Sequence, residues 1–145
     1  MDEPQISAIA HVIQLAVAPV FMLTAVGTII AALNMRLGRA VDRRRVLEER
    51  LGALPGEEAK KARAELEQIA RRIRTVYFAI VFSVLSGLFI CLLIAGAFVG
   101  AFVAANLSHM IGALFVLAML ALIVSLLLFL REIFIAVTTP RHVPG

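Results

Sequence analysis

Four polar side chains stand out because they lie in a stretch of the chain that carries no charge. Thirty-two consecutive residues, from Pro4 to Met35, include no Asp, Glu, Lys or Arg. The four candidates for a polar pathway within this stretch are His11, Gln14, Thr28 and Asn34. With a period of 3.6 residues, one helical face collects small and polar residues, here called the polar face: Ser7, His11, Gln14, Ala18, Ala25, Thr28 and Ala32. In lipid such a face favours contact with protein or water, so it could line a pore. For His11 the alternative is a position at the outer membrane interface, because it lies within two turns of the outer end of the predicted helix.

A dense basic segment follows this stretch directly and could form the mouth of such a pore. Its candidate residues are Arg36, Arg39, Asp42 and Arg43. Rings of Arg at a pore mouth select anions and rings of Asp select cations, and the sequence alone does not choose between them. The alternative is a topology determinant that anchors the chain to lipid headgroups.

No motif of known enzyme chemistry is present. The sequence lacks phosphate-binding loops, nucleophile elbows and metal-ligand clusters, and its three His residues are widely separated. The single Cys91 excludes an intramolecular disulfide. The charge-free stretches also lack the intramembrane carboxylate typical of proton-coupled carriers. We therefore expect no enzyme, cofactor or metal, and no nucleic-acid partner, because the basic residues alternate with acidic ones and flank apolar stretches.

The composition indicates an integral membrane protein. Hydrophobic residues make up 61% of the 145 residues and charged residues 17%, whereas soluble domains have roughly 45–50% and about 25%. A second charge-free stretch, Thr75 to Leu130, has 56 residues, enough for two spans of about 20 residues each. We predict transmembrane helices at Ile6–Asn34, Val76–Val103 and Met110–Leu130, with Asn106 and Ser108 as caps between the last two.

The charges also predict the topology. Residues 36–74 hold 12 of the 14 Lys and Arg residues and 7 of the 10 acidic residues, which places this segment in the cytoplasm by the positive-inside rule. The N-terminus then lies outside and the C-terminus inside. The predicted organisation is a first span (1–35), a cytoplasmic hairpin (36–75), two further spans (76–131) and a cytoplasmic tail (132–145).

The cytoplasmic segment has the pattern of an antiparallel coiled coil. Apolar residues recur in steps of three and four on either side of a turn at Leu54–Glu57, which predicts two arms that continue the first and second spans. The predicted seam positions are Leu33, Leu37, Ala40, Arg44, Leu47, Leu51 and Leu54, then Ala59, Ala62, Leu66, Ile69, Ile73 and Val76. The hairpin could be a solvated stalk. Alternatively, the charge of Arg44 would weaken a two-helix seam and favour packing between copies.

Small residues predict where helices pack closely. In the second span Ala79, Ser83, Gly87, Cys91 and Ala95 recur every four residues, followed by a GxxxG motif. This row of small side chains, here called the small-residue ridge, would allow close packing onto the first helix or onto another subunit. The predicted packing residues are Pro19, Gly27, Ser83, Gly87, Gly96 and Gly100.

Two segments, 18–27 (APVFMLTAVG) and 33–43 (LNMRLGRAVDR), resemble the signature of a family of small bacterial membrane proteins classified as a domain of unknown function. That signature has the form SPVFLL…LN…RLxRIVDR, and Ala18 stands where it has a serine. The resemblance implies three helices and a bacterial membrane, hence the cytoplasmic (inner) membrane, and implies no activity.

The sequence therefore predicts an all-α, multi-pass membrane protein that assembles as a homo-oligomer. In this prediction the oligomer conducts ions through a pore lined by the first helix and binds anionic lipids on the cytoplasmic side. The alternative is a non-conducting, membrane-anchored scaffold that acts through the cytoplasmic hairpin on an unidentified protein partner.

Overall fold

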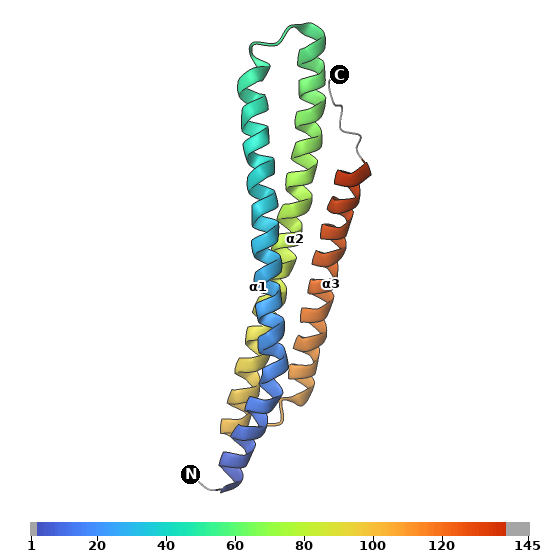
Figure 1. Ribbon diagram of the computed structural model, residues 1–145. Helices are drawn as coiled ribbons and strands as arrows, with labels where there is room; N and C mark the ends of the chain where they lie inside the picture. The colour runs from blue at the N-terminus through green and yellow to red at the C-terminus, as the bar shows by residue number, and fades with distance from the viewer. Residues whose placement is uncertain (1–2, 139–145) are drawn as a thin grey trace. The chain divides into compact units, whose positions relative to one another are not determined.

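The computed structural model describes residues 3–138 and consists of three long α-helices (Figure 1). They are α1 (Glu3–Leu51), α2 (Gly56–Val103) and α3 (Ser108–Thr138). Each contains a segment long and apolar enough to cross a membrane. The prediction of an all-helical chain with three helices that could span a membrane is confirmed.

The first two helices continue far beyond their predicted spans. Helix α1 runs through Pro19 and past Arg36 without interruption, and α2 contains both the predicted second arm and the predicted second span. The first residues of the predicted cytoplasmic tail are helical, because α3 extends to Thr138. The remainder of the tail, 139–145, lies outside the described residues.

Both connections use local hydrogen bonds. Between α1 and α2, the Ala53 amide donates to the Arg50 carbonyl, and the Glu58 amide donates to the Pro55 carbonyl at the start of α2. A proline fits at this position because its own backbone nitrogen carries no hydrogen that would need an acceptor. After α2, Ala104 adopts a positive φ of 56°. Asn106 Oδ1 then accepts bonds from the Ser108 amide and hydroxyl, at 3.2 and 2.6 Å, which confirms the predicted cap.

The chain divides into two compact units, each built from pieces of all three helices. The first contains the described residues of Met1–Ile30 with Phe82–Val124, and the second those of Ala31–Val81 with Ser125–Gly145. In the first unit Val26, Ile90 and Ala118 form the buried core, and partly buried residues such as Met22, Phe89 and Leu122 surround it.

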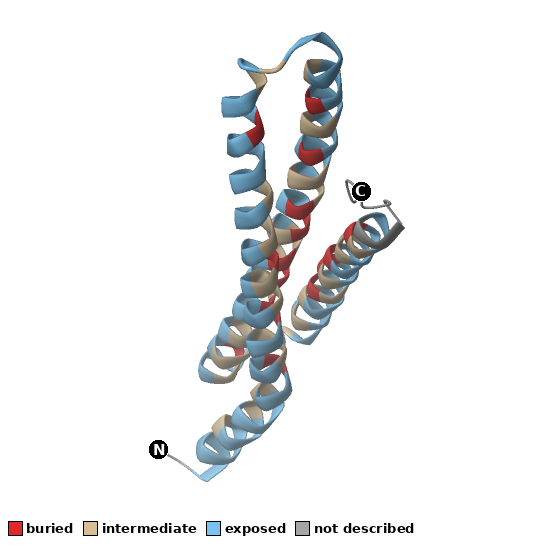
Figure 2. Ribbon diagram, turned by 45° about the horizontal axis from the view of Figure 1, so that its top comes forward, coloured by how far each residue is buried: buried red, intermediate tan, exposed pale blue. Residues whose placement is uncertain are grey.

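In the second unit the two arms run side by side, and their buried positions follow the predicted seam (Figures 1 and 2). Leu33, Leu47, Ala62, Ile69 and Val76 are buried, and the other apolar seam residues are partly buried. The supercoil that this spacing implies stays a prediction.

Arg44 departs from the expectation that it would weaken the seam. Its side chain is 50% exposed and its Nε donates to Glu48 Oε1 at 3.0 Å on the same helix. A long Arg side chain can carry its charge away from an apolar contact into water. The seam therefore contains no buried charge at this position, and Arg44 gives no reason to expect packing between copies.

Candidate functional site

The polar face of α1 is not covered by the rest of the chain. Six of its residues are exposed and only Ala32 is partly buried. The packed side of the helix carries residues seven apart, Pro19, Val26 and Leu33, all of them buried. Asn34 is also exposed.

The hydroxyl groups on α1 are satisfied by their own helix. Thr28 Oγ1 donates to the Thr24 carbonyl at 3.1 Å, and Thr24 Oγ1 to the Val20 carbonyl at 3.3 Å. No such bond exists for His11 or Gln14 within the described part of the chain. These two side chains are therefore polar groups of the face that require a partner from outside the protomer.

The predicted packing residues lie in different surroundings. Ser83 and Gly100 are buried, and a Cβ added to Gly87 would lie 3.6 Å from Val26 of α1. A Cβ on Gly96 would contact Met110 at 3.4 Å. Gly27 is exposed, with nothing within 4 Å of an added Cβ. The small-residue ridge is therefore covered at its start, whereas Cys91 and Ala95 are exposed.

Two buried serines that the sequence analysis did not single out join α2 to α3. In the first unit, Ser86 Oγ donates to the Ala118 carbonyl at 2.8 Å. In the second unit the direction is reversed, and Ser125 Oγ of α3 donates to the Ala79 carbonyl of α2 at 2.8 Å. Both hydroxyls bond carbonyls of a neighbouring helix, which fixes the register between the helices.

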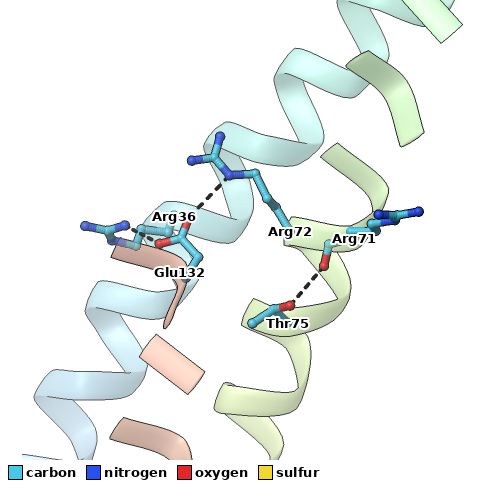
Figure 3. A network of polar contacts seen from close by, with 5 residues as sticks. All are labelled: Arg36, Arg71, Arg72, Thr75 and Glu132. Carbon is cyan, nitrogen blue, oxygen red and sulfur yellow. Dashed lines mark hydrogen bonds and ion pairs between the residues drawn. The ribbon is translucent and has the colours of Figure 1, made fainter. Parts of the chain in front are cut away.

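An ion-pair cluster joins all three helices within the second unit. Glu132 of α3 is 7% exposed, and its carboxylate accepts a hydrogen bond from Nη1 of Arg36 on α1. Its other oxygen lies 3.8 Å from Nε of Arg72 on α2 (Figure 3). The Arg36 guanidinium also lies 5.1 Å from the centre of the Phe129 ring, within range of a cation–π contact.

Glu132 is the residue that sequence reasoning missed. Its place in the sequence could have indicated it. Glu132 is the only acidic residue within the C-terminal half of the chain, and it comes directly after the second charge-free stretch and Arg131. Because three spans bring the end of the third helix to the same side as the arginines, an isolated carboxylate there would be expected to pair with them.

A pocket of about 370 Å³ opens beside this cluster. We call it the arginine pocket. It is lined by Arg36, Arg39, Ala40, Arg43, Ile69, Arg72, Val76 and Glu132. Three of the four predicted mouth residues therefore line one pocket, and Asp42 is exposed outside its lining. Within residues 3–138, no three His, Cys, Asp or Glu side chains are placed to hold a metal ion.

Comparison with known proteins gives a family without an assigned activity. Neither the curated proteins nor the solved structures include a match to this chain. One family model, described as protein of unknown function (DUF2721), matches residues 16–142. The match includes most of α1 and all of α2 and α3, so the chain belongs to the DUF2721 family.

Proposed function

We propose that this protein forms a homo-oligomeric ion-conducting pore in the bacterial cytoplasmic membrane, with the N-terminus outside and the hairpin inside. The observation that carries the proposal is the polar face of α1, which is exposed along its length in the protomer. His11 and Gln14 lie in an apolar span without a partner within the described residues, and copies arranged around an axis would give both side chains water or protein to bond.

In this arrangement the satisfied hydroxyls of Thr24 and Thr28 contribute a weakly polar wall. Arg36, Arg39 and Arg43, with Asp42, follow on the same helix at the cytoplasmic end. Their net positive charge would raise the local concentration of anions at the entrance. The pore needs neither a cofactor nor a catalytic residue.

Cysteine accessibility in planar bilayers tests the pore. In a Cys91→Ser background, we expect a positively charged thiol reagent to block most of the current through Gln14→Cys or Thr28→Cys protein. Val20→Cys is the matched control, because Val20 is exposed on a different side of α1, where the proposal places lipid. Its current should change by less than about a tenth.

If the reagent blocks the current through Val20→Cys protein as strongly as the current through Gln14→Cys or Thr28→Cys protein, the polar face does not line the pore. If purified protein carries no current at any voltage in chloride or potassium salts, the pore is wrong. The non-conducting scaffold that acts through the hairpin is then the remaining proposal.

A further inference from the structure

The arginine pocket holds more positive charge than the protein neutralises. Four arginines line it against one carboxylate, that of Glu132. Arg36 is paired with Glu132, and Arg43 Nη2 lies 3.0 Å from Glu65 Oε1, outside the pocket lining. Arg39 forms no ion pair with any described residue.

Arg72 has a donor that the protein does not satisfy. Its Nε is buried and has no hydrogen-bond partner among the described residues, because the 3.8 Å to Glu132 is too long for a hydrogen bond. The terminal nitrogens of Arg72 lie on the far side of Nε from Glu132 (Figure 3). A buried N–H without an acceptor is destabilising, so an oxyanion in the pocket would stabilise this arrangement.

The pocket's chemistry fits a phosphate ester better than a bare anion. Arginines on α1 and α2 present planar forks of donors, which match phosphate oxygens. The remaining lining is apolar, from Ala40, Ile69 and Val76, and suits the carbon backbone of an ester. A volume of about 370 Å³ is at the lower end for small-molecule sites and exceeds the volume of inorganic phosphate.

The position of the pocket along the chain indicates the source of the ester. Arg36 directly follows the first charge-free stretch, and Arg72 lies three residues before the start of the second at Thr75. Charged residues at the ends of apolar spans lie at the depth of lipid headgroups. We propose that the arginine pocket binds a phosphate ester, namely the headgroup phosphate of an anionic glycerophospholipid, with Arg39 and Arg72 as its principal ligands.

Lipid binding to the intact protein in a neutral detergent tests this site, by native mass spectrometry with increasing phosphatidylglycerol. We expect Arg39→Gln to weaken the tightest phosphatidylglycerol site about tenfold, and Arg72→Lys, which keeps the charge but loses the planar fork, to weaken it severalfold. The matched control is Arg45→Gln, because Arg45 is exposed on the same helix and does not line the pocket. It should change the dissociation constant less than twofold.

A second titration separates the possible sources of the phosphate. Phosphatidylcholine, which has a phosphate but no net charge, should bind at least tenfold more weakly than phosphatidylglycerol. Glycerol 3-phosphate tests a soluble ester. If it displaces the lipid at micromolar concentration with the same ranking of variants, the phosphate site stands and its ligand is soluble.

Equal weakening by Arg39→Gln and Arg45→Gln would overturn the proposal, because it would mean that lipid responds only to net charge. The absence of any saturable site for either ligand would overturn it as well. Arg39 is exposed and has no ion-pair partner within residues 3–138. Its replacement should therefore leave folding intact, as helical circular dichroism and a monodisperse elution profile would verify. The arginine pocket shares Arg36, Arg39 and Arg43 with the proposed pore entrance. The binding test requires no conduction, so its failure and the failure of the proposed pore are distinguishable.

Discussion

At the scale of single residues, Glu132 has the strongest link to the stability of the fold. It is the only buried carboxylate within the described residues, and it contacts Arg36 and Arg72 from two other helices. A buried carboxylate contributes through its partners, because removing its charge leaves cations that lose their neutralisation. Both arginine side chains are 38% exposed, so water reduces this effect.

Replacing Glu132 with Gln should lower the free energy of unfolding by about 2 kcal/mol, since the side-chain volume is kept and the charge is lost. Glu65→Gln is the matched control. It also removes a carboxylate from an arginine, Arg43, but the pair is exposed, at 55% and 43%, and should be worth less than about 1 kcal/mol. Thermal unfolding in detergent measures both, and equal shifts would show that the burial of Glu132 adds nothing.

At the scale of helices, much of the fold could be predicted, because charge-free stretches and apolar spacing depend on sequence-local patterns. The three spans, the Asn106 cap and the helical arms follow from such patterns. Contacts between helices could not be derived in the same way. Nothing local to α3 shows that Glu132 lies against Arg36, or that Ser125 bonds the carbonyl of Ala79.

The candidate site could likewise be predicted only where its residues lie close together in the sequence. The residues of the pore mouth stand in one short segment of α1, so Arg36, Arg39 and Arg43 were found from their density. Arg72 and Glu132 complete the arginine pocket from distant parts of the sequence. The exposed position of the Arg44 charge could not be predicted, because a seam position alone does not determine where a long side chain places its charge.

The cross-helix serine bonds give a prediction at this scale. Ser125→Ala should lower the free energy of unfolding by about 0.6–1 kcal/mol, because a hydroxyl bond between α3 and α2 is lost. Ser125→Leu should cost more, because Ser125 is 0% exposed and a larger side chain would separate the helices. Unfolding in a mixed-detergent titration compares them.

Thr24→Ala is the control for these serine variants. Its hydroxyl also bonds a backbone carbonyl, but on its own helix and at an exposed position. We expect a change within about 0.5 kcal/mol. A loss equal to that of Ser125→Ala would indicate that bonds within and between helices contribute alike.

At the scale of the whole molecule, the apolar surface exceeds what one copy covers. The most apolar windows of the three helices are only 11%, 28% and 17% buried. Lipid can cover apolar side chains such as Val20, Leu120 and Leu127, all of them exposed. The polar face of α1 differs, because lipid cannot bond His11 or Gln14. The two kinds of exposed surface therefore call for different neighbours, lipid on one and protein or water on the other.

Cross-linking distinguishes these neighbours. In a Cys91→Ser background, Ala25→Cys places a thiol on the polar face at an exposed position, and we expect a short bifunctional maleimide to give covalent dimers and larger species in native membranes. Leu120→Cys is the control, since Leu120 is 54% exposed on α3, where we expect lipid. Equal cross-linking at both positions would indicate random collision, and a single protomer mass by native mass spectrometry would contradict assembly. Because polar faces that meet around an axis exclude lipid, efficient coupling at Ala25→Cys alone would identify α1 as the helix nearest the symmetry axis.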